Sequence, residues 1–206
     1  LSCSSAASDV YKRQLHTPQL IPTKEGELWH IDEDKCCWRA LTWLPGETHH
    51  KLRGSSLAYS AGRQVAHWHS ALTDFKHEFH FSRPGAHDTP AHMVALQDAL
   101  EAHANHRLYD SVAPLAEGIL ESWRSWGGSL ESSTRLCHGD LKVSNLRFTE
   151  SGEAFALLDL DTMGYMPLEV ELGDAWRSWC NPAAEDVDNA QFDLGLFEAS
   201  AKGYLS

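Results

Sequence analysis

The sequence has few basic residues and no long apolar run. It contains 17 lysines and arginines against 29 aspartates and glutamates, which gives a formal net charge of -12. Nucleic acid and anionic membranes are bound by clustered basic side chains, so this excess of acid argues against either as a partner. No apolar run approaches the roughly 18 residues that a membrane-spanning helix requires. The composition is that of a soluble cytoplasmic protein.

Cysteine and histidine are present, but not at the spacings of a metal site. The five cysteines include no CxxC pair, and reduced thiols are the simplest account of them. The 13 histidines are not combined with cysteines or carboxylates at a recognised zinc spacing. With 206 residues, of which 42% are hydrophobic, the chain can bury the core of one domain, or of one lobe and part of another.

The first 14 residues are not expected to belong to the fold. Residues 4–14 resemble the conceptual translation of sequencing-adapter DNA, so we expect 1–14 to be a non-native segment. They do not read as a targeting signal, because the basic pair Lys12-Arg13 precedes no apolar core. The chain also stops within an apparent helix at its other end. We therefore expect a fragment of a longer natural protein.

Two short runs carry the chemistry of this chain. Residues 138–145 read HGDLKVSN, and residues 156–161 read ALLDLD. They place a carboxylate at Asp140, a carboxamide at Asn145 and a second carboxylate at Asp159. Magnesium prefers hard oxygen ligands and keeps several waters, so one or two protein oxygens beside phosphate oxygens suffice to hold it. The pattern predicts an enzyme that holds magnesium on a nucleotide and transfers a phosphoryl group.

Each of these side chains has a predicted role. Asp140 would accept the proton of a substrate hydroxyl, as a general base. Asn145 and Asp159 would bind the metal. Lys142, two residues beyond the base, could reach the transferred phosphoryl group as a cation.

A predicted hairpin brings the two metal ligands together. Residues 146–148 and 155–158 read as short strands around the turn-like stretch 149–153. Asn145 precedes the first strand and Asp159 follows the second, so both fall at one end of the hairpin, beside the loop that carries Asp140.

At these residues the chain resembles the aminoglycoside phosphotransferase and choline kinase family. The family's HGDxxxxN loop and its later IDxx segment are matched by residues 138–145 and 158–161. Residues 158–162, 173–178 and 181–186 look most like the branch that contains N-acetylhexosamine 1-kinase. The resemblance implies an α+β, protein-kinase-like two-lobed fold. It also implies ATP and Mg²⁺ as cofactors and transfer of the γ-phosphoryl group to a small-molecule hydroxyl, for which we favour a sugar.

The front of the chain departs from the family pattern. No glycine-rich turn precedes Trp38, and neither Lys24 nor Lys35 lies in an apolar strand, where the family has a phosphate-pairing lysine. We therefore expect an incomplete N-lobe, with strands and hinge in residues 15–46, followed by a truncated C-lobe in 47–206. Glu171 stands where many members have aspartate, which puts its supporting role in doubt.

The resemblance also assigns a nucleotide-binding hinge. Residues 27–31 and 36–43 read as a hairpin around 32–35, which in the family would be the last N-lobe strand pair. Thr42, Trp43 and Leu44 would then read adenine through backbone groups. A buried hairpin without any ligand remains an alternative.

Periodic apolar residues predict the helices of the larger lobe. Steps of three and four indicate helices over 57–75 and 112–126. Thr89 as N-cap and Pro90 in the first turn predict a third through Leu100. Two more are expected at 171–179 and 192–204. We expect their apolar faces to lie mainly in the core.

Several alternatives stay open on sequence alone. His87-Asp88 could contact a metal or sugar, or could orient the helix that follows. Asp161, Asp174 and Arg177 could serve the substrate or form structural salt bridges. The chain could be a pseudokinase or ligand-binding module, because the phosphate-gripping elements are missing. Asp159-Leu160-Asp161 also resembles a haloacid-dehalogenase-type phosphatase motif, although that motif expects Thr or Val at Met163.

Overall fold

The computed structural model describes residues 15–79, 83, 85–129, 132–183 and 190–206. The chain forms two compact units: unit 1 comprises Leu1–Phe81 and Ser133–Ser206, and unit 2 comprises Ser82–Ser132. The segment that we set aside, 1–14, lies outside the described residues. The expected domain limits, which differ from these units, stay a prediction.

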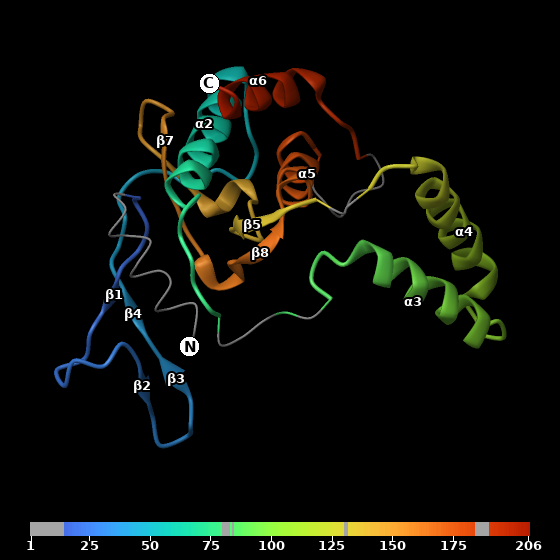
Figure 1. Ribbon diagram of the computed structural model, residues 1–206, viewed down its shortest axis with the longest axis horizontal. Helices are drawn as coiled ribbons and strands as arrows, with labels where there is room; N and C mark the ends of the chain where they lie inside the picture. Colours follow the sequence, from blue (N-terminus) through green and yellow to red (C-terminus); the bar gives the residue numbers. More distant parts are fainter. Residues whose placement is uncertain (1–14, 80–82, 84, 130–131, 184–189) are drawn as a thin grey trace. The chain divides into compact units, whose positions relative to one another are not determined.

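Unit 1 begins with two short antiparallel strand pairs (Figure 1). Strand β2 (His30–Ile31) pairs with β3 (Cys37–Trp38), which confirms the predicted hairpin. Strand β1 (Leu20–Ile21) pairs with β4 (Ala40–Leu41). We did not predict this pairing, because a strand of two residues is too short to leave an alternating pattern in the sequence.

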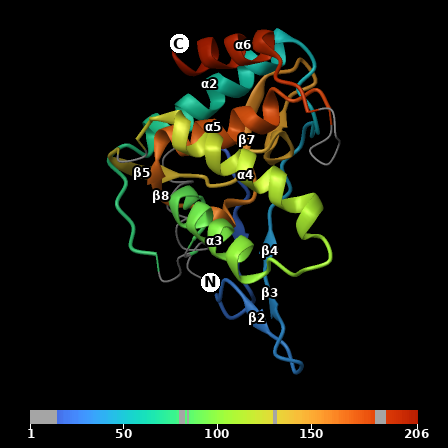
Figure 2. The ribbon, with the colours of Figure 1, turned by 90° about the vertical axis from the view of Figure 1, so that its right-hand side faces the viewer.

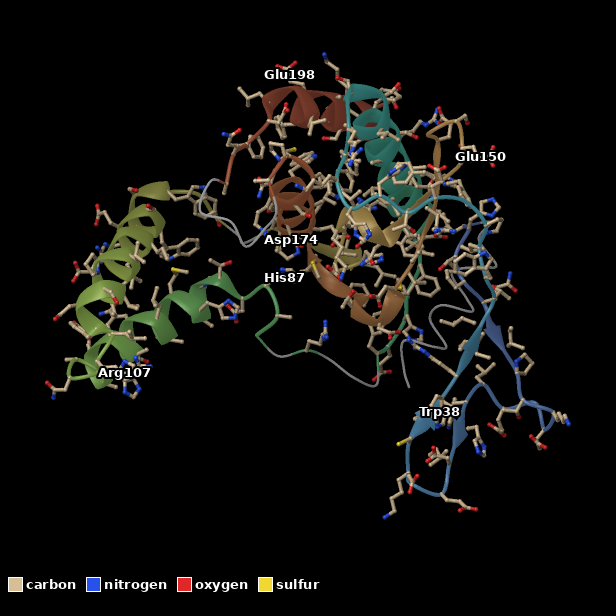
Figure 3. All side chains as sticks on the ribbon, turned by 180° about the vertical axis from the view of Figure 1, so that it is seen from behind. Trp38, His87, Arg107, Glu150, Asp174 and Glu198 are labelled. Carbon is tan, nitrogen blue, oxygen red and sulfur yellow. The ribbon has the colours of Figure 1, made fainter. Side chains whose placement is uncertain are left out.

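The alternative of a buried hairpin is wrong, because both strands of the β2–β3 pair are exposed. Trp38, labelled in Figure 3, is 62% exposed. Its indole Nε1–H donates to the Asp32 carboxylate at 2.7 Å, and the other oxygen of that carboxylate accepts from the Cys36 N–H at 2.8 Å. The turn is therefore held by local hydrogen bonds rather than by burial.

Two helices of unit 1 lie side by side, α2 (Ser55–Ala71) and α6 (Leu194–Tyr204), as Figures 1 and 2 both show. Gly62 and Gly203 permit this close approach. A Cβ on Gly62 would lie 2.0 Å from the Ser200 carbonyl oxygen, and one on Gly203 would lie 2.0 Å from that of Tyr59. Helix α2 ends four residues before the predicted limit, where the hydroxyl of Thr73 donates to the His69 carbonyl.

The centre of unit 1 contains two further strand pairs and one helix. Strand β5 (Thr134–Cys137) pairs with β8 (Gly164–Pro167), and β6 (Leu146–Phe148) pairs with β7 (Ala154–Leu157). Short 3-10 turns, η1 (Val143–Asn145) and η2 (Leu160–Thr162), lead into β6 and β8, and helix α5 (Leu168–Trp179) follows β8. The hairpin predicted around 149–153 is confirmed, with Glu150 at its turn in Figure 3.

The core of unit 1 joins these elements. Each fully buried large side chain contributes about 1.5–3 kcal/mol relative to an exposed one. The largest ones are Trp68, Trp179, Phe148, Leu15, Leu141, Leu146 and Leu157. Five of these seven come from residues 141–179, so the predicted catalytic segment lies within the best-packed part of the unit.

Unit 2 consists of α3 (Thr89–Ala102) and α4 (Tyr109–Trp126). The N-cap of α3 is Asp88, not Thr89 as predicted, because the Asp88 carboxylate accepts from the Ala91 N–H at 3.1 Å. The carboxylate at the preceding position outcompetes the hydroxyl as an acceptor for the free N–H groups of the first turn. Asp88 thus orients the helix, one of the two alternatives left open.

We expected the apolar faces of unit 2 to lie mainly in the core; within its described residues this is wrong for α4, whereas Met93, Leu96 and Leu100 of α3 are half-buried. Helix α3 buries no side chain, and α4 buries Ala113, Ala116 and Leu120. Leu115 and Ile119, on the predicted face, are 69% and 50% exposed. Two helices alone offer little surface to each other, so among the described residues of unit 2 only two alanines and one leucine of α4 are buried.

The described residues are α+β, as predicted. None of the described helices has the length and apolar character needed to cross a membrane. The four described cysteines are free thiols, with Cys36 and Cys37 exposed and Cys137 and Cys180 buried.

Candidate functional site

In the loop between β5 and η1, the side chain of Asp140 contacts those of Lys142 and Asn145. The Lys142 Nζ lies 2.7 Å from Asp140 Oδ2. The carboxamide Nδ2 of Asn145 donates to the same oxygen at 3.1 Å and to the Asp140 carbonyl at 2.8 Å. The side chain of Asp140 is 29% exposed, and both side-chain contacts, from Lys142 and from Asn145, are to Oδ2.

The direction of the Asn145 amide follows from these contacts. Only the nitrogen can donate to two oxygens, so Nδ2 faces Asp140 and the amide oxygen Oδ1 points away from these two contacts. Asn145 is 6% exposed, which limits its rotamers and fixes where that oxygen lies.

The second carboxylate arrives at the same end of the hairpin. The Leu158 N–H donates to the Asn145 carbonyl at 2.8 Å, so Asp159 follows directly on the residue paired with Asn145. Asp159 is exposed and has a left-handed backbone, with φ of 57°. Such a conformation is uncommon outside glycine and is concentrated at functional sites. The backbone therefore places Asp159 at the same end of the hairpin as Asn145, whose side chain contacts Asp140.

His138 supports the loop rather than facing outward. It is fully buried, its Nδ1 accepts from the Asp140 N–H at 3.3 Å, and its Nε2 lies 2.7 Å from the Leu158 carbonyl. These partners require a lone pair on Nδ1 and the proton on Nε2, hence a neutral ring. The hydroxyl of Thr162 donates to the His138 carbonyl at 2.8 Å. His138 thus links the Asp140 loop to the segment carrying Asp159.

Glu171 on α5 clamps the same loop from the other side. It is 2% exposed, and its two oxygens accept from the backbone N–H groups of His138 at 2.7 Å and Gly139 at 2.9 Å. Burial alone would raise the pKa of this carboxyl, but hydrogen bonds from the His69 side chain and from those two N–H groups hold the pKa below its ordinary value. The carboxylate is therefore ionised and holds the backbone of residues 138–139. The glutamate at this position, where many family members have aspartate, thus has a structural role.

The hinge predicted at residues 42–44 is tied to β6 by Arg147, a residue that sequence reasoning missed. Arg147 is 6% exposed, and its Nη2 donates to the carbonyls of Leu44 at 2.8 Å and Gly46 at 2.6 Å. Its guanidinium carbon lies 5.0 Å from the ring centroid of Trp43, which is 81% exposed. The Thr42 N–H donates to the Gln19 carbonyl at 2.8 Å and so belongs to the strand pair.

The other charged residues of the site region form ion pairs. Arg39, between β3 and β4, donates to both oxygens of Asp161, with 2.8 Å between Nη1 and Oδ1. Asp174 and Arg177 pair with each other on α5 at 3.1 Å. Structural salt bridges are thus present at all three positions that the sequence left open. Arg39 in particular joins the N-terminal strands to the segment that follows Asp159.

The donor set fits a hard divalent cation. Asn145 offers an amide oxygen and Asp159 a carboxylate, and both are of the type that magnesium takes alongside phosphate oxygens and water. The softer trio of His69, Cys137 and Glu171 lies elsewhere and is buried.

Comparison with known proteins agrees with this geometry. The sequence model of the phosphotransferase enzyme family matches residues 6–204. An aminoglycoside-3'-phosphotransferase of type VIII is 17% identical, with a TM-score of 0.55, over 98% of this chain and 70% of that one. The streptomycin–ATP complex of APH(2'')-IIa is 14% identical, with a TM-score of 0.58, over 99% and 66%.

A third solved structure, macrolide 2'-phosphotransferase from Brachybacterium faecium, is 19% identical, with a TM-score of 0.52, over 98% of this chain and 64% of that one. At these identities the likeness concerns the fold, and it confirms the predicted protein-kinase-like class. The chain spans about two thirds of the length of these structures. With the family match over residues 6–204, the chain belongs to the phosphotransferase enzyme family.

Proposed function

We propose that the protein is an ATP- and magnesium-dependent phosphotransferase that transfers the γ-phosphoryl group to a hydroxyl of a small molecule. The observation that carries the proposal is the arrangement of Asp140, whose Oδ2 is held by Lys142 and Asn145 beside the segment of Asp159. The family match supports phosphoryl transfer as the reaction class.

Asp140 is the proposed general base. It takes the proton of the acceptor hydroxyl while the new O–P bond forms and the bond between the β–γ bridging oxygen and the γ-phosphorus breaks, which releases ADP. The contacts of Lys142 and Asn145 with Oδ2 fix the orientation of the carboxylate. Lys142 lies close enough to follow the phosphoryl group and offset the charge that develops on it.

Asn145 and Asp159 are the proposed metal ligands. The amide oxygen of Asn145 and the carboxylate of Asp159 would hold Mg²⁺, which supplies charge neutralisation on the phosphate oxygens. The bond from Asn145 Nδ2 to Asp140 couples the two tasks, because one side chain orients the base and offers its other atom to the cation.

The nucleotide base is proposed to bind at residues 42–44, with Trp43 and Leu44 closest to it. The Thr42 N–H is already used in the strand pair, so Thr42 contributes position rather than a free donor. Arg147 fixes the Leu44 carbonyl and thereby the path of this segment relative to Asn145, two residues earlier in the chain. This is the pre-organisation that phosphoryl transfer needs.

For the acceptor we favour a sugar hydroxyl. The support is the resemblance of residues 158–162 and 173–178 to the N-acetylhexosamine kinase branch. The names of similar structures, which include aminoglycoside and macrolide phosphotransferases, support a polyhydroxylated compound more generally. A catalytically inactive nucleotide-binding protein is the second candidate. The dehalogenase-type alternative loses its ground, because Asp159 lies in a segment matched to another family.

The test compares Asp140→Asn with a matched control, Asp98→Asn, which alters an exposed carboxylate on α3. Turnover of ATP with a panel of sugars, aminoglycosides and amino alcohols is measured in the full protein that contains this chain. We expect Asp140→Asn to lower turnover by about 10²–10⁴-fold while ATP binding is retained, because proton transfer is lost and the metal ligands remain. Equal turnover in the two variants would contradict the assignment, and ATP binding without turnover in the unaltered protein would favour the inactive candidate.

A further inference from the structure

A buried polar cluster lies behind the Asp140 loop, and its members come from four elements of unit 1. His69 from α2 and Glu171 from α5 are 1% and 2% exposed. The His69 Nε2 lies 3.4 Å from Glu171 Oε1, and its Nδ1 lies 2.9 Å from the hydroxyl of Tyr204 on α6. Cys137 at the end of β5 completes the cluster.

The protons of this cluster can be placed from its partners. An ionised carboxylate can only accept, so the nitrogen of His69 that faces Glu171 must carry a proton. The other ring nitrogen, Nδ1, lies 2.9 Å from the Tyr204 hydroxyl, which can donate to it when the ring carries its proton on Nε2. Burial raises the pKa of Tyr204 above its ordinary value, which keeps that hydroxyl protonated.

Glu171 needs this donor in order to hold the loop. As a carboxylate it accepts the N–H groups of His138 and Gly139, one on each oxygen. If a proton were bound to one oxygen, that oxygen would become a poor acceptor, and one of the two buried N–H groups would lose its partner. Burial favours the protonated form of Glu171, and the hydrogen bond from His69 favours the ionised form by lowering the pKa of this carboxyl.

We propose that His69 is a positioning residue for the Asp140 loop, acting through Glu171, and that Tyr204 fixes the ring tautomer that this role requires. The proposal rests on the proposed function only in naming Asp140 as the group that is positioned. Helix α6 then helps to support the site, because hydrogen bonds lead from Tyr204 through His69 and Glu171 to the backbone of residues 138–139.

The same cluster is better suited to hydrogen bonding than to a metal ion. The ligand atoms of His69, Cys137 and Glu171 lie within 4.8 Å of one another. Burial, and then the charge of Glu171, raise the pKa of Cys137 to about 12, so the thiol stays protonated. The thiol also lies 3.7 Å from the Met166 carbonyl, and both oxygens of Glu171 already accept N–H groups.

The experiment measures amide hydrogen exchange of His138 and Gly139 in the whole chain by NMR, together with the ring nitrogen signals of His69. His69→Gln keeps an N–H donor at the position of Nε2, whereas His69→Leu removes it. Val65→Ala is the control, because Val65 is buried on the same helix and its loss weakens packing without removing a donor.

We expect His69→Leu to speed exchange at the two amides by about tenfold relative to the amides of β6 and β7, since a buried N–H loses a well-placed acceptor. His69→Gln restores most of the protection, and Val65→Ala leaves that ratio unchanged. In the unaltered chain the ring signals show a protonated Nε2 and an unprotonated Nδ1. Tyr204→Phe, the milder variant if His69→Leu does not fold, alters the Nδ1 signal and produces a smaller loss of protection.

Equal exchange ratios in His69→Leu and Val65→Ala would overturn the proposal, and so would a proton on Nδ1. A shift of the His69 ring signals on addition of Zn²⁺ alone would also overturn it, in favour of a metal site. None of these readouts uses ATP turnover. If the exchange results hold and Asp140→Asn remains active, the support of the loop stands and the proposed function fails.

Discussion

Replacing Glu171 with glutamine removes one charge and little volume from the centre of unit 1. The carboxylate accepts two buried backbone N–H groups, at 2.7 and 2.9 Å. A glutamine offers one carbonyl oxygen, and its amide nitrogen would face the second N–H, so one donor must lose its partner. The loop that carries Asp140 is the segment released.

The size of the effect follows from that lost partner. A buried donor left without an acceptor is destabilised by about 1–3 kcal/mol. For a chain of this length, each kcal/mol lowers the melting temperature by roughly 2–4 °C, so we expect a decrease of roughly 2–12 °C. Glu198→Gln on α6 is the matched control, because Glu198 is exposed (Figure 3) and its change should be within about 0.5 kcal/mol.

Urea unfolding across a pH series gives the sharper assay. The pKa of Glu171 is lower in the folded chain than in the unfolded one, so its contribution is fully present above the unfolded pKa of about 4.3. It is lost as the pH falls through the folded value. The difference in unfolding free energy between Glu171→Gln and the unaltered chain should therefore be largest near neutral pH and shrink below about pH 4. A variant as stable as Glu198→Gln at pH 7 would refute this reasoning.

Three other substitutions test neighbouring parts of the account. Gly139→Ala places a Cβ 2.4 Å from the Thr162 carbonyl oxygen at a φ of 81°, so unfolding by urea should show a loss of at least about 1–3 kcal/mol; normal stability would mean that the loop can move freely. Asp159→Ala removes a proposed metal ligand that is exposed, so little packing is lost. The magnesium concentration for half-maximal turnover should rise, or turnover should vanish, and an unchanged magnesium requirement would contradict the assignment of Asp159 as a ligand. Asp88→Ala removes the cap of α3 and should weaken that helix by about 0.5–2 kcal/mol, seen as faster exchange of the Ala91 amide, whereas unaltered exchange would show that the cap is dispensable.

The chemistry-bearing loop could be predicted from the sequence because its contacts are local. Asp140 and Asn145 are five positions apart, and the turn between them needs no other element to bring them together. Asp159 is farther away, yet a hairpin of two short strands spans the gap, and hairpins leave a pattern in the sequence.

The support behind that loop could not be predicted, because it depends on how separate elements pack. His69 and Glu171 are 102 positions apart, and His69 and Tyr204 are 135 apart. The signal that was available is the position of His69 on the buried face of α2, directly after Trp68 and four residues after Val65. A histidine on such a face requires partners, but periodicity does not name them.

The apolar pattern misled most in unit 2. Leu115 and Ile119 repeat at helical spacing on α4 and were expected in the core, yet they are exposed within the described unit. Periodicity identifies a helix and an apolar stripe, but burial needs a partner of sufficient area. Arg147 is a residue whose role the sequence did not predict. It lies in a short strand, and nothing in the local pattern indicates that its side chain donates to the carbonyls of Leu44 and Gly46.

The most direct test of the central claim uses Mn²⁺ with ATP and the NMR amide signals of the chain. Mn²⁺ takes oxygen ligands as Mg²⁺ does and broadens signals of nearby nuclei, even when binding is weak. The account predicts that the amides of Asp140, Asn145 and Asp159 broaden first, and that Asp159→Ala weakens this effect. Sharp signals at these three residues, while amides elsewhere in the chain broaden, would contradict it.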